Sequence, residues 1–201
     1  MEPILTAKIG TNADLFPDIL KLYVPHGSGV LDMTYGTGVF WKRVDMSSYS
    51  VIKNDIDPER GEFSYDLADL PKEWAGQCDA VVLDPPYKLT GTKHKKDHYG
   101  NESRGRNRAW GLYIDGISEA VRVLKKGGML IVKCMDQVAL HKQNWMHIFV
   151  YEQAMKHKMI AIDLFVLVRT RARPQPHKHQ IHGRKNHSFF WVFRNGGGTL
   201  I

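Results

Sequence analysis

Short apolar segments alternate with turns and amphipathic stretches along most of this chain, and no other feature of the sequence constrains its fold as much. Apolar runs typical of strands lie at residues 30–34, 51–54, 63–65, 80–83, 129–132, 160–168 and 188–193. The run at 63–65 is the weakest of them. Strands that alternate with helices at this spacing favour βαβ units. The sequence therefore predicts an α/β fold around a mostly parallel sheet of seven strands.

Three stretches have the apolar spacing of helices. The first ends near Tyr23 and carries Pro17 in its opening turn, where proline is tolerated. The second runs from Trp110 to Leu124 and is followed by a pair of glycines, and the third covers residues 145–155. A chain of 201 residues has the length of one domain, which we expect to span residues 1–201.

Composition excludes several classes of protein. Charged residues make up 24% and hydrophobic residues 43% of the chain, which is ordinary globular usage. The longest apolar stretch, residues 159–168, contains Asp163 and is far too short to span a membrane. Cys78 and Cys134 give neither a disulfide framework nor a metal-ligand spacing. We expect a soluble, cytoplasmic protein that does not bind membranes.

The first segment that indicates chemistry is the glycine turn, residues 32–38, which reads Asp-Met-Thr-Tyr-Gly-Thr-Gly. It follows a predicted strand, and Gly36 and Gly38 let the backbone turn tightly and approach a ligand. Asp55 follows the next predicted strand, where an acid can bind the ribose of an adenosine, and a further acid, Asp66, follows the strand after that. No P-loop lysine follows the glycines. The pattern favours an adenosine-type cofactor without phosphates over a turn of purely structural role.

The most informative segment is Asp84-Pro85-Pro86-Tyr87, which closes the strand predicted over residues 80–83. Its two prolines fix the backbone and remove two N–H donors. The Asp84 carboxylate and the Pro85 carbonyl can then accept both hydrogens of an amino group, and the Tyr87 ring offers a stacking face for the heterocycle. An amino nitrogen held in this way would attack a methyl donor mainly through proximity. The alternative is a strand-ending turn without a chemical role.

Together these residues resemble the class I S-adenosylmethionine-dependent amino-methyltransferases, and among them the DNA adenine-N6 methyltransferases. The resemblance covers residues 6–194 or so. It implies a Rossmann-like class I methyltransferase fold, with an antiparallel last strand and helices on both faces of the sheet. It also implies an enzyme that uses S-adenosyl-L-methionine to methylate the N6 amino group of adenine in DNA, with the target base flipped into the pocket of residues 84–87.

The resemblance also assigns roles to individual residues. The glycine turn would bind the methionine moiety of the cofactor, Asp55 its ribose, and Asp66 would lie near its adenine amine. The expected cofactor-binding residues are Asp32, Thr34, Tyr35, Gly36, Gly38, Asp55, Ile56 and Asp66. The expected catalytic residues are Asp84, Pro85, Pro86 and Tyr87, and no metal is expected.

The sequence departs from this family in two respects. Met33 and Thr34 stand where the family usually has proline and an aromatic residue. The large target-recognition insert of most sequence-specific members is also absent, so either loops of this chain or a separate specificity partner would recognise the polymer. Cytosine-N4 in DNA and adenine-N6 in RNA stay open as substrates. A non-catalytic nucleic-acid-binding or regulatory protein on the same fold is a further alternative, against which the intact motif at 84–87 argues.

The net charge of +7 lies in two segments rather than along the whole chain. Residues 88–109 carry a net charge of +5 and residues 169–187 a net charge of +6. Both segments follow predicted strands at the edge where ligands of such sheets bind, so they are placed to neutralise phosphates around a flipped base. The expected nucleic-acid contacts are Lys88, Lys93, Lys95, Lys96, Arg104, Arg106, Arg108, Arg171, Arg173, Lys178, Arg184, Lys185, Asn186 and His187. Two solvated charged loops are the alternative.

Histidines are concentrated in the second basic segment. His177, His179 and His182 precede His187, a spacing that invites a metal-binding interpretation. The segment contains neither cysteine nor carboxylate, however, and contacts with phosphates or bases fit these side chains better.

Overall fold

A seven-stranded sheet forms the centre of the computed structural model, which describes residues 3–86, 108–139, 142–170 and 181–196. Its strands are β1 (Ala7–Ile9), β2 (Gly29–Asp32), β3 (Ser50–Lys53), β4 (Cys78–Leu83), β5 (Leu124–Cys134), β8 (Ile160–Val168) and β9 (His187–Arg194). They lie in the order β1-β8-β9-β5-β4-β2-β3. Only β9 is antiparallel to its neighbours in this sheet. The predicted α/β architecture, with a mostly parallel sheet and an antiparallel last strand, is confirmed.

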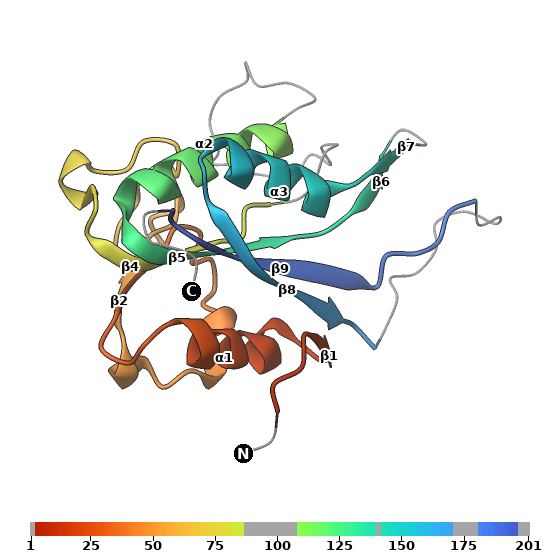
Figure 1. Ribbon diagram of the computed structural model, residues 1–201, viewed down its shortest axis with the longest axis horizontal. Coiled ribbons are helices and arrows are strands. Elements are labelled where there is room, and N and C mark those ends of the chain that lie inside the picture. Colours follow the sequence, from red (N-terminus) through yellow and green to blue (C-terminus); the bar gives the residue numbers. More distant parts are fainter. Residues whose placement is uncertain (1–2, 87–107, 140–141, 171–180, 197–201) are drawn as a thin grey trace.

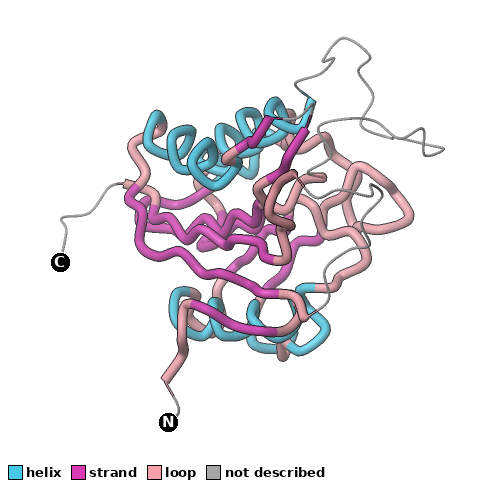
Figure 2. Tube along the Cα trace, turned by 90° about the vertical axis from the view of Figure 1, so that its right-hand side faces the viewer, coloured by secondary structure: helices cyan, strands magenta, loops and turns pink. Residues whose placement is uncertain are grey.

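Helices cover both faces of the sheet, as predicted. Helix α1 (Asn12–Tyr23) lies on one face, and α2 (Arg108–Val123) and α3 (Met146–Lys156) lie on the other (Figure 1 and Figure 2). The remaining described elements are short. They are the 3-10 helices η1 (Phe40–Arg43), η2 (Met46–Ser48) and η3 (Lys72–Trp74) and the hairpin of β6 (Gln137–Ala139) and β7 (Lys142–Asn144). No helix in these described parts is long and apolar enough to cross a membrane.

Alternate side chains of the central strands supply two hydrophobic cores, one on each face of the sheet. In β4, Val81 and Leu83 belong to the core under α2 and α3. Ala80 and Val82 of the same strand belong to the opposite core, which contains Phe16 of α1. Because both faces are buried, the central strands read as continuous apolar runs, and this is why the sequence alone could locate them.

Six of the seven strands in the sheet correspond to predicted strands, and β1 does not. Residues 63–65 form no strand, and Phe63 makes only an isolated parallel bridge with Asn54. The unpredicted strand β1 lies instead at the opposite edge of the sheet, beside β8. Its three residues are too few to show a period, and two of them are exposed. The β6–β7 hairpin was also missed, because its strands are equally short and most of their residues are polar.

The glycine turn leads into η1, a 3-10 helix. One predicted boundary also differs from the structure. Helix α2 ends at Val123 and β5 begins at the next residue, so Gly127 and Gly128 lie within β5 and do not end the helix. Gly127 has a φ of 81°, and the pairing of β4 with β5 shifts register near this point. The glycine pair marks an irregularity in a strand, a use of glycine that the sequence did not distinguish from a helix end.

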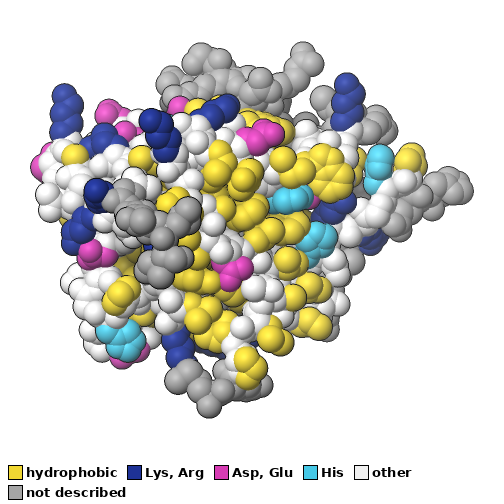
Figure 3. Space-filling model, in the orientation of Figure 1, with side chains coloured by type: hydrophobic (Ala, Val, Ile, Leu, Met, Phe, Trp, Pro, Cys, Tyr) yellow, Lys and Arg dark blue, Asp and Glu magenta, His cyan; other side chains and the backbone are white. Residues whose placement is uncertain are grey.

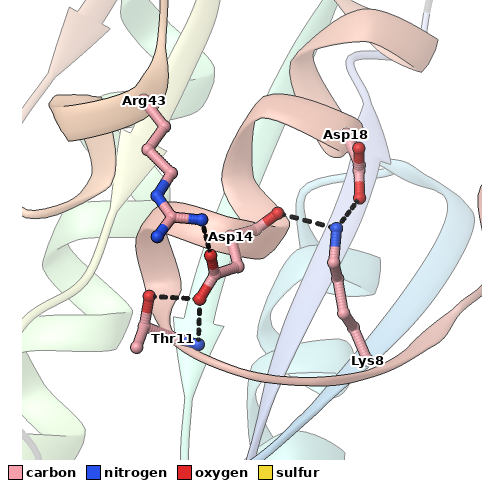
Figure 4. Close-up of polar contacts among 5 residues, drawn as sticks. All are labelled: Lys8, Thr11, Asp14, Asp18 and Arg43. Atoms are coloured by element: carbon pink, nitrogen blue, oxygen red, sulfur yellow. Dashed lines mark hydrogen bonds and ion pairs between the residues drawn. The ribbon is translucent and has the colours of Figure 1, made fainter.

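The N-terminal end of α1 is fixed by a network of charged side chains (Figure 4). The Asp14 carboxylate accepts hydrogen bonds from the backbone N–H of Thr11 at 2.7 Å and from its hydroxyl at 2.6 Å. Arg43 of η1 also pairs with Asp14. Lys8 of β1 donates to Asp18 at 2.5 Å and to the Asp14 carbonyl at 2.9 Å. The network ties β1, α1 and η1 together, and thereby anchors the segment that follows the glycine turn.

A partly buried hydroxyl joins α1 to the sheet at its other end. The Tyr23 hydroxyl donates to Oδ2 of Asp163 in β8 at 2.6 Å. Burial, together with this hydrogen bond to a carboxylate, raises the pKa of Tyr23 to about 12. Asp163, which interrupts the longest apolar run of the sequence, is therefore paired with a residue of α1.

We expect Tyr23→Phe to lower the free energy of unfolding by about 1 kcal/mol, because the partly buried Asp163 carboxylate loses its hydrogen-bond donor. Tyr49→Phe is the matched control, since the Tyr49 hydroxyl lies 3.4 Å from the Val24 carbonyl and makes at best a weak hydrogen bond. Urea unfolding of both variants at pH 7 measures the two losses. Equal losses would show that the contact with Asp163 adds nothing.

Candidate active site

The carboxyl ends of neighbouring strands bring the predicted motifs together. Strands β3, β2, β4 and β5 lie side by side. Asp32 is the last residue of β2, Asp84 directly follows β4, and Asp55 lies two residues after β3. The chain passes from β2 to β3 on one side and then crosses to β4 on the other, so the strand order reverses at β2. Ligands of open α/β sheets bind beyond the carboxyl ends of the strands at such a point.

A hydrogen bond joins the glycine turn directly to the Asp-Pro-Pro segment. The backbone N–H of Asp84 donates to Oγ1 of Thr34 at 2.8 Å, across a sequence separation of 50 residues. One residue earlier in the turn, the N–H of Met33 donates to the carbonyl of Val82 at 3.0 Å. Pro85 is buried and Pro86 is exposed. The two motifs that the sequence singled out therefore form a single site.

Glycines shape the turn itself. Gly36 and Gly38 have φ values of 58° and 66°, in the left-handed region that glycine adopts most readily. A Cβ atom on Gly38 would lie 2.7 Å from the Tyr35 hydroxyl. The Tyr35 ring thus lies against the turn, and the Nζ of Lys53 is 5.8 Å from the centre of this ring. Gly38 is required for its backbone conformation and for the room it leaves to Tyr35.

Asp32 is a buried carboxyl group, 3% exposed, at the base of the turn. Its Oδ2 accepts a hydrogen bond from Nε1 of Trp41 at 2.7 Å, and its Oδ1 accepts one from the N–H of Thr34 at 3.1 Å. Burial raises the pKa of Asp32 to about 7, the two hydrogen bonds oppose this rise, and the nearby charges of Asp84 and Asp55 add to it. The group therefore changes charge near neutral pH.

Asp55 holds the glycine turn against the loop that follows β3. It is buried, its Oδ2 accepts from the N–H of Gly36 at 2.8 Å, and its Oδ1 accepts from the N–H of Asp57 at 2.9 Å. Carboxylates have about four lone-pair positions in all, so each oxygen can still accept a ribose hydroxyl. Ile56 is half-buried in the same loop, and its carbonyl accepts the Ser64 hydroxyl at 3.1 Å.

Asn54, which the sequence analysis did not select, organises this loop from inside. It is fully buried, and its side chain exchanges hydrogen bonds of 3.0 and 2.9 Å with the backbone of Tyr65. Phe63 and Tyr65 are each 40% exposed, and their rings stack at 6.0 Å. Both rings also contact Trp74 edge-on. These aromatic side chains form a cluster, in which the two partly exposed rings of Phe63 and Tyr65 are nearly parallel.

Asp66 directly follows Tyr65 in the chain. Its side chain is less enclosed by the protein than that of Asp55, which is buried. The Asp66 side chain is exposed, and its Oδ1 accepts a hydrogen bond from the N–H of Ala68 at 2.9 Å. Since the predicted strand at 63–65 does not form, Asp66 is not a strand-end acid. Its expected role near the adenine amine of the cofactor stays a prediction.

Lys133 is the most important residue of the site that the sequence analysis missed. Its side chain is 2% exposed, and its Nζ lies 3.0 Å from Oδ2 of Asp84. The other oxygen of Asp84, Oδ1, is buried and has no hydrogen-bond partner within the described residues. The sequence signal that could have revealed it is a lysine directly after the apolar run that is predicted as a strand over residues 129–132.

Tyr87 lies outside the described residues, and so do most of the predicted nucleic-acid contacts. The contacts that lie outside are Lys88, Lys93, Lys95, Lys96, Arg104, Arg106, Arg171, Arg173 and Lys178. Arg108 is the first residue of α2. His177 and His179 are outside the described residues as well, and within the described ones no group of three or more His, Cys, Asp or Glu side chains could hold a metal.

Residues 184–187 are described and lead into β9. Because β9 is antiparallel to β5, its first residues lie at the edge of the sheet where β5 ends. The Nζ of Lys185 is 5.5 Å from the ring of Trp145, which is 51% exposed. The ring of His187 contacts Phe189 edge-on at 5.1 Å. In the orientation of Figure 1, Figure 3 shows histidine side chains next to hydrophobic ones on the right-hand side of the molecule.

Comparisons with known proteins identify the fold. No protein-family model matches the chain, and no curated protein matches it. An S-adenosylmethionine-dependent methyltransferase from Methanosarcina mazei has a TM-score of 0.57 at 13% identity, over 88% of this chain and 96% of that one. The N-methyltransferase NodS from Bradyrhizobium japonicum WM9 has a TM-score of 0.54 at 13% identity, over 90% and 94% of the two chains.

The chain has a Rossmann-like methyltransferase fold. A candidate DNA modification methylase from Thermus thermophilus is also similar, at 16% identity and a TM-score of 0.45. That match covers 67% of this chain and 50% of the other, so the chain spans half the length of that protein. The similarity to the methyltransferases from Methanosarcina mazei and Bradyrhizobium japonicum establishes the fold.

Two glycines with the same backbone conformation test the glycine turn. Gly38 has a φ of 66° and lies against Tyr35, whereas Gly76 has a φ of 65° and a Cβ on it would meet nothing within 4 Å. Gly76→Ala should cost about 1–2 kcal/mol of stability, the penalty of the left-handed conformation. Gly38→Ala should cost about 1 kcal/mol more, because Tyr35 must also move. Denaturant unfolding compares them, and equal losses would contradict the close approach of Tyr35.

The burial of Asp32 predicts a specific pH dependence of stability. The folded protein binds the Asp32 proton up to about pH 7, whereas an unfolded aspartate releases it near pH 4. The stabilisation from this group is therefore present below about pH 4 and is lost as the pH rises to about 7. Between these limits, the stability of Asp32→Asn should rise relative to that of the wild type by up to about 1.4 kcal/mol per pH unit. Urea unfolding from about pH 4 to 8 measures it, and a constant difference would contradict it.

Proposed function

We propose that this protein is an S-adenosylmethionine-dependent methyltransferase that methylates the exocyclic amino group of a nucleobase, with the N6 of adenine in DNA as its target. The observation that carries this proposal is the hydrogen bonding of Asp84. Its buried Oδ1 has no partner within the described residues, and its backbone is hydrogen-bonded to Thr34 of the glycine turn. An acceptor that is buried, unpaired and joined to a nucleotide-binding turn suits an amino group presented next to a bound cofactor.

The residues of the site fit S-adenosylmethionine. The charges of Asp32, Asp55 and Asp84 lie close enough to influence one another, and such a cluster suits a cationic ligand. Asp55 retains acceptor positions for ribose hydroxyls, and the exposed rings of Phe63 and Tyr65 suit a purine. The sequence contains no phosphate-binding lysine after the glycine turn, which agrees with a cofactor that has no phosphates. When bound, this cofactor supplies a methyl group on a positively charged sulfur.

Asp84 and Pro85 then orient the nucleophile. Oδ1 of Asp84 and the carbonyl of Pro85 would each accept one N–H of the target amino group, which turns the nitrogen lone pair toward the methyl donor. A C–N bond forms as the C–S bond breaks, and the nitrogen afterwards releases a proton. Because the Asp84 N–H is bonded to Thr34, the acceptor of the target amino group has a fixed position relative to the turn that would hold the cofactor. Proximity and orientation of this kind account for most of the rate enhancement that we expect.

Charge and aromatic side chains support a nucleic acid as the substrate. The chain carries a net charge of +7, and Lys185 and Trp145 present a cation and an exposed ring at the same edge of the sheet as Asp84. Aromatic rings beside cations bind splayed nucleotides through stacking and phosphate contacts. DNA is the proposed polymer, in agreement with the sequence resemblance, and cytosine-N4 in DNA and adenine-N6 in RNA are the products that a test has to distinguish from it.

Incubation of the purified protein with labelled S-adenosylmethionine and with duplex DNA, single-stranded DNA or RNA tests this proposal. After digestion to nucleosides, we expect the label in N6-methyladenine from DNA. Label in N4-methylcytosine, or label in RNA alone, would change the target while keeping the enzyme class. A protein that binds nucleic acid but neither binds nor consumes S-adenosylmethionine would instead be a non-catalytic nucleic-acid-binding protein.

Asp84→Asn should lower kcat by about 100-fold or more, because the side chain keeps its size but loses the charge that pairs with Lys133 and orients the acceptor. Binding of S-adenosylmethionine, measured by calorimetry, should change by less than about threefold, since Thr34 bonds to the backbone of Asp84 and not to its side chain. Asp79→Asn is the matched control, because Asp79 lies in β4, the strand that Asp84 directly follows, and also pairs with a lysine. Undiminished turnover of Asp84→Asn would refute the mechanism.

A further inference from the structure

Lys133 is a buried cation in an otherwise apolar environment. It belongs to β5, whose Ile131 faces the core that contains α1, and side chains two residues apart on a strand share a face. The Nζ of Lys133 lies 5.5 Å from the ring centre of Phe40 and 5.9 Å from that of Phe190, and both rings belong to that core. An ammonium group is rarely buried in this way unless a specific partner compensates for the loss of water.

The Asp84 carboxylate is that partner. The distance between the Nζ of Lys133 and Oδ2 of Asp84 is 3.0 Å, and the two side chains are 2% and 19% exposed. Buried ion pairs contribute little net stability, because desolvation offsets most of the attraction, and well-packed apolar side chains often replace them without loss. The fold alone therefore gives no reason for a lysine at position 133. The contact does, however, occupy one oxygen of Asp84 and leave the other one unpaired in the described part of the chain.

We propose that Lys133 is a positioning residue for the methyl-transfer reaction, which binds Oδ2 of Asp84 and thereby reserves Oδ1 as the acceptor for the target amino group. This inference rests on the proposed function. Two constraints then hold the Asp84 carboxylate in place, because Lys133 fixes the side chain and Thr34 fixes the backbone. Lys133 also balances negative charge in a site where the charges of Asp55 and Asp84 already act on Asp32.

The same two strands provide a matched control pair. Lys125 of β5 binds Oδ1 of Asp79 in β4 at 2.6 Å, with the side chains 47% and 35% exposed. This pair connects β4 with β5 toward their amino ends, whereas Lys133 and Asp84 connect them at the carboxyl ends. Lys125→Met therefore removes a lysine–aspartate contact between these strands without touching the site.

Kinetics of four variants test the proposal. Lys133→Met should lower kcat at least about 10-fold, with less than about a threefold change in the dissociation constant of S-adenosylmethionine and in the KM for the nucleic acid, whose phosphate contacts dominate affinity. Lys125→Met should keep kcat within about twofold of the wild type. The double variant Asp84→Asn/Lys133→Met should be no slower than Asp84→Asn alone, because Lys133 acts through Asp84.

Two kinetic results would overturn the proposal. One is a kcat of Lys133→Met within about twofold of the wild type, at a temperature where circular dichroism shows both proteins folded. The other is a double variant slowed by the product of the two single effects, which would mean that Lys133 acts independently of Asp84. A loss of thermal stability in Lys133→Met with kcat unchanged would mark the pair as structural only.

A spectroscopic measurement separates this proposal from the proposed function. In protein labelled with ¹³C at the aspartate carboxyl carbons, the Asp84 resonance is identified by its absence in Asp84→Asn. We expect it to shift in Lys133→Met and to stay in place in Lys125→Met. If the resonance responds in this way but the wild type methylates none of the polymers tested, the proposed function fails and the control of Asp84 by Lys133 stands. A resonance that does not respond overturns the inference, whatever the activity.

Discussion

Several carboxylates crowded at one edge of a parallel sheet are the constraint on which the rest of this structure depends. Like charges repel strongly where water is excluded, so each carboxylate needs its own compensation. Asp32 obtains it from Trp41, and Asp84 obtains it from Lys133. Asp55 obtains it from backbone N–H groups, including that of Gly36. The glycine turn, the η1 helix and the end of β5 have the positions they do because these partners must reach the carboxylates.

This arrangement explains which parts of the fold the sequence could predict. Strands β2, β4 and β9 and the second half of β5 are buried on both faces or nearly so, and β8 is partly buried along most of its length. Their apolar runs are visible without any knowledge of the partner strand. Strand β1 is short and mostly exposed, and it exists only because β8 offers it an edge. Residues 63–65 have strand-like composition but are tied to the loop after β3 by Asn54, a contact between side chain and backbone that periodicity does not encode.

The residues of the candidate site also divide into those that the sequence could predict and those that it could not. Acids directly after apolar runs were found at Asp32, Asp55 and Asp84, because strand ends in a parallel sheet meet at one edge. Lys133 was missed although it touches Asp84, since the contact spans 49 residues of sequence and depends on which strands are neighbours. A local pattern shows that a charged side chain lies at the end of an apolar run. Which residue this side chain contacts depends on the order of the strands in the sheet.

The departure of this chain from the family pattern in the glycine turn has a physical explanation in the same geometry. Met33 is buried in the core under α2 and α3, so this position requires an apolar side chain rather than proline specifically. Thr34 contributes a hydroxyl that accepts the N–H of Asp84, a donor that would otherwise be left next to two prolines with none of their own. Thr34 connects the glycine turn to the Asp-Pro-Pro segment by a hydrogen bond that an aromatic hydrocarbon side chain could not make. A change at Thr34 would therefore affect the Asp-Pro-Pro segment as well as the turn.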